Sequence, residues 1–489
     1  MAAWSAMARG LGPGGGRARA PRLRDAVRKR SEEMDAPFYF PGHKRGGDAA
    51  ARRDLPELEE VDNLFAPTAA IKDAQDAAAG LFGAATTLFS VNGSTAGVVA
   101  AILATCDEQH ALVLPRDAHQ SATHGLVLSG ARPVYLQARH AHGGDVSLGT
   151  SAEDVAAALE ANPAQVGAVL IVSPSYHGMC ADVAAVAAVC ALHRVPLLVD
   201  EAHGAHLGLS ADLPRSALQQ GACVAVQSTH KSLGALSQAG MVHVAHGARV
   251  DAGAVRRALH TLTSSSPSYL LLASLDAARA QVDGKAGAAA LAAVSKRARD
   301  TRERIEGIGW ACLDSDDPWK ITVLLDEDDT WSGDDLDDFT CDECGVVCEL
   351  PRPRSVLYAC GIGTTQDHAD RLVESLARAR DAMDRHTDRR VDMPPPPLPA
   401  LPLPSARLTP RAAFLLARRA QRCVPAADAV GSTSAEVLAP YPPGVPLIVP
   451  GETFTQVVLD ALQSFARAGG AVAGASDPTL CTVAVLDDM

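Results

Sequence analysis

The stretch Pro196-Leu197-Leu198-Val199-Asp200 is a short apolar run that ends in a carboxylate, and it decides the fold of this chain. Two further runs, Val169–Ser173 and Cys223–Ser228, also pass from apolar to polar residues. Such runs are typical of buried parallel strands whose carboxyl ends form a site. Because similar runs alternate with Ala-rich helical stretches between Asp25 and about Arg390, the sequence predicts an α/β fold with a mainly parallel sheet.

The composition is that of a globular protein without a basic surface. The 489 residues include 44 Lys and Arg against 57 Asp and Glu, and 47% are hydrophobic. A formal net charge of -13 argues against nucleic acid as a partner, and the length predicts two to four domains. Eleven Cys, an odd number, are typical of reduced thiols, so we expect a cytoplasmic protein.

Three segments carry compositional signals of their own. Residues 77–106 are uncharged, but Asn92-Gly93-Ser94-Thr95 would leave polar groups in lipid, so we expect a buried helix-loop-helix and no membrane span. Residues 1–24 hold five Arg and no acidic residue, which fits either a disordered tail or a transit peptide for a plastid or another organelle. The Pro-rich residues 394–404 are expected to be a semi-rigid linker.

A lysine follows one of the predicted strands, in the segment Ser228-Thr229-His230-Lys231-Ser232. It is surrounded by hydroxyls and a His, and desolvation of such a lysine favours the neutral amine. A neutral ε-amine condenses with an aldehyde to give a Schiff base, while the hydroxyls and backbone N–H groups can hold a phosphate. Taken alone, the segment fits a surface lysine after a strand better than a nucleophile.

Asp200 ends the strand 31 residues upstream and leads into Glu201-Ala202-His203. A carboxylate in this position can hydrogen-bond the protonated nitrogen of a pyridine ring, and the small Ala202 would let that ring lie flat. The alternative for Asp200 is a helix N-cap.

Two more segments precede these in the chain. Asn92-Gly93-Ser94-Thr95 can start a helix whose free N–H groups bind an anion, or it can serve as a plain helix N-cap. In Arg116-Asp117-Ala118-His119, the His119 ring can stack on an aromatic cofactor or fill a helix N-terminus.

In the order anion loop, His, Asp, Lys, the sequence resembles the Orn/Lys/Arg decarboxylase family of fold type I pyridoxal-phosphate enzymes. The short form of the family, without an N-terminal wing domain, is the better match. The motifs that carry the resemblance span most of residues 25–460, namely Phe40-Pro41-Gly42-His43-Lys44-Arg45-Gly46-Gly47, Ser173-Pro174-Ser175-Tyr176-His177-Gly178, Thr263-Ser264-Ser265-Ser266-Pro267-Ser268-Tyr269, Pro440-Tyr441-Pro442-Pro443-Gly444-Val445-Pro446 and Pro450-Gly451-Glu452.

The resemblance implies an aspartate-aminotransferase-like large domain with smaller α+β domains after it. It implies a tail at 1–24, a cofactor-binding domain at 25–285, a small domain at 286–390, a linker at 391–406 and a C-terminal domain at 407–489. It also implies decarboxylation of a small basic amino acid (arginine, lysine or ornithine) to agmatine, cadaverine or putrescine and CO₂. A homodimer or a dimer of dimers with shared active sites is implied as well.

Residue by residue, the resemblance implies that Lys231 bonds covalently to pyridoxal 5'-phosphate, Asp200 pairs with its pyridine nitrogen and His119 stacks on its ring. His230 or Lys231 would return a proton to the substrate. The implied cofactor-binding residues are Ser94, Thr95, His119, Asp200, Ala202, His203, Ser228, His230 and Lys231, with Ser265 and Ser266 reaching the phosphate of the partner.

Some assignments stay open from the sequence. Glu436 and Glu452 are candidates for binding the distal cation of the substrate, with helix capping as the alternative. Cys341, Cys344 and Cys348 lie in an acidic, strand-like stretch and lack a fourth zinc ligand, so no metal is expected. An aminotransferase or carbon–carbon lyase, with Arg352 or Arg354 clamping the α-carboxylate, and a non-catalytic cofactor-binding scaffold are the competing functions.

Overall fold

The computed structural model of the chain describes residues 22–32, 44, 49–162, 165–326, 329, 331–385, 403, 405–442, 444–467 and 469–487. Most of the tail at 1–24, most of the Phe40–Gly47 motif and most of the Pro-rich linker therefore lie outside the described residues.

A seven-stranded sheet forms the centre of the molecule. In spatial order its strands are β1 (Thr86–Ser90), β9 (Gly240–Val244), β8 (Val224–Gln227), β7 (Leu197–Asp200), β6 (Val166–Val172), β2 (Ala111–Pro115) and β3 (Arg132–Leu136). Within this sheet β9 alone runs against its neighbours, so the sheet is mainly parallel as the sequence predicts. The three strands predicted from apolar runs are β6, β7 and β8, displaced by one to three residues at their ends.

Helices cover both faces of this sheet because successive side chains of a strand point to opposite faces. Leu198 of β7 packs with α5 (Gly93–Leu103), α6 (Gln120–Ser129) and α10 (Ala252–Leu262). Its neighbours Leu197 and Val199 pack on the other side with α7 (Ala152–Ala161) and α8 (Val183–His193). Each strand therefore contributes to two cores, which explains why it is apolar without alternation.

A close approach seats α5 on the sheet. An added β-carbon at Gly97 would lie 2.6 Å from Cγ1 of Val226 and 2.8 Å from Cγ2 of Val242. Only a glycine lets the helix lie this near to β8 and β9. The first turn of α5 is thereby held beside the end of β8.

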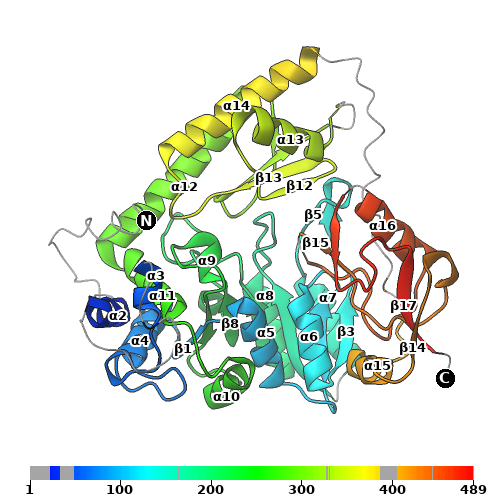
Figure 1. The fold of residues 1–489 in the computed structure, drawn as a ribbon, viewed down its shortest axis with the longest axis horizontal. Helices are drawn as coiled ribbons and strands as arrows, with labels where there is room; N and C mark the ends of the chain where they lie inside the picture. The colour runs from blue at the N-terminus through cyan, green and yellow to red at the C-terminus, as the bar shows by residue number, and fades with distance from the viewer. Residues whose placement is uncertain are drawn as a thin grey trace.

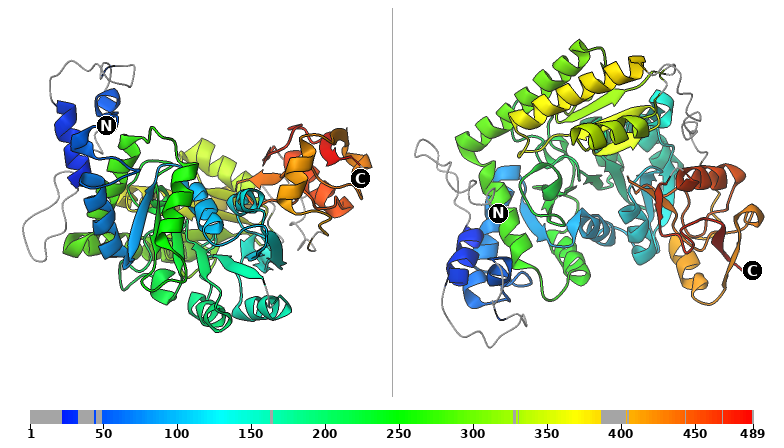
Figure 2. Two further views of the ribbon diagram at one scale, coloured as in Figure 1. Left: turned by 90° about the horizontal axis from the view of Figure 1, so that it is seen from below. Right: turned by 45° about the horizontal axis from the view of Figure 1, so that its top comes forward.

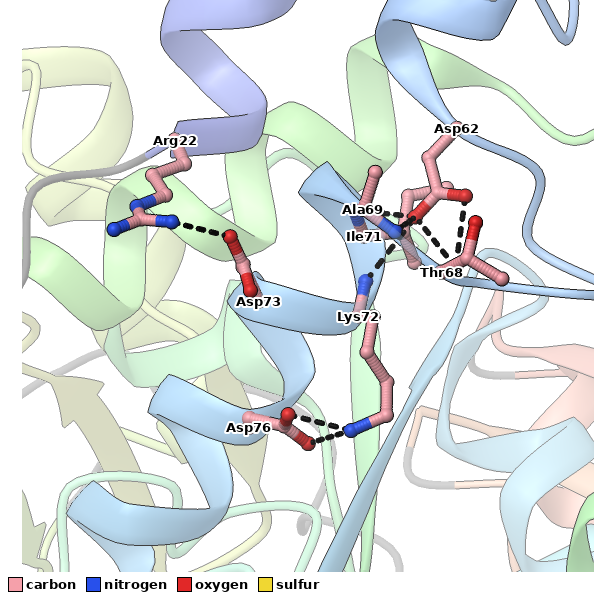
Figure 3. A network of polar contacts seen from close by, with 8 residues as sticks. All are labelled: Arg22, Asp62, Thr68, Ala69, Ile71, Lys72, Asp73 and Asp76. Carbon is pink, nitrogen blue, oxygen red and sulfur yellow. Dashed lines mark hydrogen bonds and ion pairs between the residues drawn. The ribbon is translucent and has the colours of Figure 1, made fainter.

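The N-terminal helices pack against the edge of the sheet at β1, where Figure 1 draws them in blue. They are α2 (Arg22–Glu32), α3 (Ala49–Arg53), η1 (Glu59–Val61) and α4 (Ala70–Phe82), and α11 (Tyr269–Gln281) lies with them. Figure 3 shows the polar contacts that hold this group, including the Arg22–Asp73 ion pair between α2 and α4 and the Lys72–Asp76 pair within α4.

Asp62 anchors the start of α4. Its carboxylate accepts hydrogen bonds from the backbone N–H groups of Thr68, Ala69, Ile71 and Lys72. Burial alone would raise the pKa of Asp62, but these donors outweigh it and leave the pKa below its usual value.

A smaller layered unit lies above the sheet in Figure 1. It has an antiparallel sheet in the order β10 (Ala311–Cys312), β11 (Lys320–Leu324), β13 (Ser355–Ala359) and β12 (Leu350–Arg352). The helices α12 (Gly284–Gly307), α13 (Gly333–Cys344) and α14 (Gln366–Arg385) pack with this sheet over a core that includes Trp310 and Leu376.

The C-terminal unit lies at the opposite end of the molecule from the N-terminal helices, as both views in Figure 2 show. It has its own core around Leu438, Phe454 and Leu462. Its elements are α15 (Pro410–Ala417), β14 (Gln421–Pro425), η4 (Ala426–Asp428), β15 (Ala439–Tyr441), α16 (Gln456–Arg467), β16 (Ala471–Ala473) and β17 (Thr482–Leu486). The strands pair as β14 with β17 and β15 with β16.

Two local predictions are wrong. The helix-loop-helix expected over residues 77–106 contains the strand β1, because Gly83 in the left-handed region ends α4 before a β-branched and aromatic run. The acidic stretch that contains Cys341 is helical, because Ser332 and Asp335 form a capping box that starts α13. Across the described residues no helix is both long and apolar enough to cross a bilayer.

Candidate active site

A cavity of ≈ 640 Å³ lies at the C-terminal ends of the parallel strands. Its walls come from the segments after β1, β2, β6, β7 and β8, from Glu349 to Arg352 of the small unit, and from the loop around Tyr441 of the C-terminal unit. Predicted site residues that line it are Ser94, Thr95, His119, Asp200, Ala202, His203, Ser228, His230 and Lys231. The strand order therefore brings together residues that are up to 137 positions apart.

Lys231 lies in the four-residue helix α9 (Thr229–Ser232), directly after β8. Its Nζ lies 2.9 Å from Nε2 of His203, and the ring of Tyr176 lies beneath it at 5.9 Å. Burial lowers the pKa of Lys231 and the positive charge of Lys320 adds to this, while Asp200 opposes it. The amine is therefore easier to deprotonate than an exposed lysine.

Asp200 is the last residue of β7 and is 6% exposed. Its Oδ1 accepts the backbone N–H of Ala202 at 3.1 Å. Burial raises the pKa of Asp200, and the charge of Lys231 opposes the rise. A carboxylate at the edge of the cavity has capacity to accept a further hydrogen bond from a cationic group.

The first turn of α5 and the end of β8 form a polar corner of the cavity. Ser228 Oγ donates to Ser94 Oγ at 2.7 Å, and Gly93 adopts φ +71, which turns the chain into the helix. The N-terminus of α5 carries backbone N–H groups with a positive dipole end. Oδ1 of Asn92 is buried at this corner without a hydrogen-bond partner among the described residues.

His119 is the N-cap of α6. Its Nδ1 accepts the backbone N–H of Ser121 at 3.2 Å, which leaves Nε2 and the ring face toward the cavity. Burial lowers the pKa of His119 to about 4, with a further contribution from Lys231. The ring is therefore neutral near pH 7. His119 is the helix N-cap, one of the two roles considered from the sequence, and it also lines the cavity, where stacking on a cofactor stays a prediction.

His230 precedes the lysine and also lines the cavity. Its Nδ1 lies 2.8 Å from the carbonyl oxygen of Ala239, so Nδ1 carries a proton and donates it there. Burial lowers the pKa of His230, so the neutral ring keeps Nε2 as an acceptor.

Two cavity residues, Tyr176 and Glu349, had no assigned role in the sequence analysis, whereas Arg352 was a candidate clamp for an α-carboxylate. Tyr176, in the Ser173–Gly178 motif, donates from its hydroxyl to Oε1 of Glu349 at 2.6 Å and thus joins the large and small units. Arg352 lines the cavity with its Nε 4.0 Å from Oδ1 of Asp145. The Tyr176 motif was the one available signal, because Glu349 and Arg352 sit in a segment without local pattern.

Four predicted residues are placed elsewhere in this chain. Ser265 and Ser266 are exposed in the segment between α10 and α11 and do not line the cavity. The Glu436 carboxylate accepts from the backbone N–H groups of Ser476 and Ala484, so it holds the C-terminal unit together. Glu452 is 1% exposed and pairs with Arg116 at 2.9 Å.

The cysteines and acidic groups do not assemble into a metal site. All eleven cysteines are free, and the described parts of the chain contain no group of three or more His, Cys, Asp or Glu side chains that could hold an ion.

Comparisons with known proteins agree on one family. The sequence pattern of "Orn/Lys/Arg decarboxylase, major domain" matches residues 21–337, and that of "Orn/Lys/Arg decarboxylase, C-terminal domain" matches residues 400–476. The arginine decarboxylase of Bacillus subtilis is 32% identical over 95% of this chain and 98% of that protein. The arginine decarboxylase of Halalkalibacterium halodurans is 33% identical over 92% and 94% respectively.

Solved structures show the same fold. Lysine decarboxylase LdcF of Francisella novicida superposes with a TM-score of 0.80 at 23% identity, covering 96% of this chain and 81% of that one. Serine palmitoyltransferase of Sphingomonas wittichii gives a TM-score of 0.55 at 18% identity, covering 75% and 85%. The fold is therefore that of fold type I, aspartate-aminotransferase-like proteins, as expected from the sequence.

Proposed function

The chain belongs to the Orn/Lys/Arg decarboxylase family, and from this premise we propose that it releases CO₂ from a basic amino acid with pyridoxal 5'-phosphate as cofactor. The observation that carries the proposal is the meeting in one cavity of a lysine with a lowered pKa, a buried carboxylate and a corner of hydroxyls and helix N–H groups. Each matches one part of the cofactor, namely its aldehyde, its ring nitrogen and its phosphate.

The donors and acceptors of the cavity fit this cofactor. The corner at Ser94, Thr95 and Ser228 offers hydroxyls and the positive end of α5 to a phosphate, and the unpartnered Oδ1 of Asn92 lies beside it. Asp200 offers a carboxylate to a protonated ring nitrogen. Between them, His119 offers a neutral aromatic ring to one face of the cofactor, and Ala202 leaves space on the wall of the cavity.

Pyridoxal phosphate, when bound, supplies a sink for the electron pair that remains on the substrate when CO₂ departs. The residues of the chain prepare the site for this. Lys231 presents a neutral ε-amine that can bond the aldehyde, and Asp200 keeps the proton on the ring nitrogen through its negative charge. His119 would lie against one face of the cofactor ring and would keep it in place.

A proton must reach Cα of the substrate after CO₂ has left. Lys231 is the candidate donor, because its amine lines the cavity and can carry a proton to the substrate there. His230 is less suited, since its Nδ1 proton is donated to Ala239 and its Nε2 accepts.

Arginine is the first substrate to test. The two most fully covered relatives described above are named arginine decarboxylases, and the cavity wall carries carboxylates that can meet a distal cation, among them Asp117 and Glu349. Glu436 is not proposed for this role, because its oxygens are taken by backbone N–H groups. Glu452 likewise holds Arg116.

We further propose that the enzyme is a homodimer in which Ser265 and Ser266 of the partner subunit complete the phosphate site. Their exposure in a single chain, outside its own cavity, is compatible with this position. A cytoplasmic location remains the expectation from the cysteine content. We also propose that residues 25–285, 286–390 and 407–489 form three separate domains.

The arginines offered for an aminotransferase do not favour that alternative. Arg352 is beside Asp145, and the Arg354 guanidinium donates to the carbonyl oxygen of Asp326 at 3.0 Å. Neither is a free clamp for an α-carboxylate, and a tight clamp in the ground state would oppose loss of CO₂.

The test is an incubation of the pyridoxal-phosphate-loaded protein with arginine, lysine or ornithine, measuring CO₂ and the amine product. Release of CO₂ and agmatine, cadaverine or putrescine in equal amounts is expected from one of them. Lys231→Ala is expected to abolish both, whereas the exposed Lys296→Ala retains them. Formation of an α-keto acid without CO₂ would overturn the proposal, and absence of all turnover with an intact cofactor band would favour a non-catalytic scaffold.

A further inference from the structure

A second lysine, Lys320, is buried behind the wall of the cavity. Lys320 begins β11 in the small unit and is 8% exposed, yet it does not line the cavity itself. Its Nζ lies 3.4 Å from Nδ1 of His203, whose Nε2 lies 2.9 Å from Nζ of Lys231. One imidazole ring therefore connects two lysine amines that come from different units of the molecule.

Elementary chemistry restricts the protonation of this row. A lysine ammonium only donates, and a neutral imidazole has one N–H and one lone pair. Burial lowers the pKa of His203 well below its usual value, so the ring is neutral, as are the neighbouring His119 and His177, whose pKa values burial lowers to about 4 and about 3. Both contacts can be hydrogen bonds only if one of the two lysines is a neutral amine.

The surroundings indicate which lysine keeps its proton. Lys320 faces Asp317, whose Oδ1 lies 3.0 Å from Nε2 of His206 and whose Oδ2 is buried without a hydrogen-bond partner among the described residues. Burial raises the pKa of Asp317, but His206 and Lys320 outweigh it and leave this pKa lowered, so Asp317 carries a negative charge. That charge favours the ammonium form of Lys320.

The remaining titratable groups do not reverse this order. Glu349 faces both lysines and so does not discriminate between them, while Cys360 beside Lys320 is a neutral thiol, because burial raises its pKa to about 11. Tyr176 beneath Lys231 is a neutral phenol, since burial raises its pKa. Asp200 faces Lys231 and opposes the lowering of its pKa, but burial outweighs it there, and Oδ1 of Asp200 already accepts the backbone N–H of Ala202.

We propose that Lys320 is a positioning residue for Lys231, whose ammonium donates to Nδ1 of His203 and thereby fixes the imidazole proton on Nε2, directed at the lone pair of the Lys231 amine. This inference rests on the proposed function, because it concerns the amine that would capture the cofactor. Lys320 thus holds Lys231 in the nucleophilic form through one intervening ring.

The loop of residues 175–178 is fitted around this row. An added β-carbon at Gly178 would lie 2.9 Å from both Cβ and Cγ of Lys320, so a side chain there would displace it. The carbonyl oxygen of Gly178 accepts the backbone N–H of Asp317 at 3.0 Å, and the Tyr176 ring packs against His203 at 4.4 Å. The Ser173–Gly178 motif, which has no assigned role from the sequence, holds both the ring and the second lysine.

The test is the rate at which the full-length apoprotein captures pyridoxal phosphate, followed by the visible absorption of the lysine adduct from about pH 6 to pH 10. Capture needs the neutral amine, so the pH midpoint of the rate reports on Lys231. Lys320→Met lets the His203 proton move to Nδ1. We therefore expect the pH midpoint of the capture rate to rise by about one unit, which makes capture about tenfold slower at pH values below the midpoint. The exposed Lys296→Met is the charge-matched control and keeps the midpoint.

A double-mutant cycle separates the relay from a plain charge effect. In a His203→Phe background, which keeps an aromatic ring but removes both nitrogens, Lys320→Met is expected to leave the midpoint unchanged. A midpoint shift that persists in this background would overturn the proposal, as would an unshifted midpoint in Lys320→Met alone.

A second variant covers the case in which Lys320→Met does not fold. His203→Phe by itself is expected to raise the midpoint, and an unchanged midpoint would again contradict the relay. Failure of the parent protein to capture the cofactor at any pH would instead remove the proposed function, and the inference with it.

Discussion

Gly444 of the C-terminal unit lies against the ring of His119. An added β-carbon at Gly444 would come within 3.2 Å of both Cδ2 and Nε2 of that ring, and the Gly444 carbonyl accepts the backbone N–H of Gln120 at 3.0 Å. The Pro440–Pro446 motif therefore bounds the cavity from a unit more than 300 residues along the chain from His119. This contact makes the C-terminal unit part of the site.

Gly444→Ala is expected to displace the His119 ring and to slow CO₂ release by about tenfold, because a misplaced ring no longer orients the cofactor. Gly431→Ala is the matched control, since both glycines have φ +84 but Gly431 has nothing within 4 Å of the added carbon. Both variants carry the same backbone strain, so turnover should fall only in Gly444→Ala. Equal losses in the two would contradict the role of the contact.

Asp200→Asn is expected to reduce turnover by about 100-fold or more while leaving the apoprotein at least as stable as the parent. The amide keeps an oxygen for the backbone N–H of Ala202 but lacks the charge that retains a ring proton. The neutral amide also avoids the cost of burying a charged carboxylate, the cost that raises the pKa of Asp200 in the parent protein. Steady-state CO₂ release and thermal unfolding check the two parts, with the exposed N-cap variant Asp182→Asn as the control.

Arg116→Met is expected to lower the free energy of unfolding by about 3–5 kcal/mol, because it leaves Glu452 buried without its charged partner. The two side chains are 10% and 1% exposed, and Arg116 also donates to the carbonyl oxygens of Pro446 and Leu447. Urea denaturation measures the change, and Arg257→Met, in an exposed pair, is the control. A loss no greater than that of the control would contradict the role of this pair in docking the C-terminal unit.

Glu201 is expected to make the protein less stable as the pH rises. Burial raises its pKa to about 7 from 4.5, against hydrogen bonds from Gln227 and Ala217. A carboxyl group with a raised pKa in the folded state contributes stability that is complete below the unfolded pKa and is lost as the pH rises through the folded pKa. The free energy of unfolding should therefore fall by about 3 kcal/mol between about pH 4.5 and pH 7.

Glu201→Gln should flatten that part of the profile, since the amide does not ionise. Urea denaturation at several pH values measures it, and Glu160→Gln on the exposed face of α7 should reproduce the profile of the parent. A Glu201→Gln profile that falls as steeply as that of the parent would show that another group is responsible.

Local pattern was sufficient for the parts of the site that follow a strand. Asp200 and Lys231 could be placed at the same edge of the sheet because Asp200 ends an apolar run and Lys231 follows another shortly after its end. Parallel strands present their carboxyl ends at one edge. Residues 86–90 could not be predicted in the same way, because an uncharged, Ala-rich neighbourhood fits a buried helix as well as a strand.

Local pattern was not sufficient to place Lys320, Glu349 and Gly444 in the site. Lys320 and Glu349 come from segments with no chemical pattern of their own, whereas Gly444 belongs to the Pro440–Pro446 motif, whose contact with His119 the sequence did not indicate. All three reach the cavity or its wall only because a later unit packs over the sheet. Glu436 shows the converse, since an acidic residue just before the Pro440–Pro446 motif was a candidate for the substrate cation, whereas in the structure its oxygens accept backbone N–H groups.

By itself, the sequence determined the α/β class, the sheet edge that carries the chemistry and the residues on that edge, because strand periodicity and strand direction are local properties of the chain. Only the tertiary structure decided which groups face them from the other two units. Those contacts depend on how whole layers pack, and a protonation state such as that of Lys231 depends on burial and on charges that the chain order does not reveal.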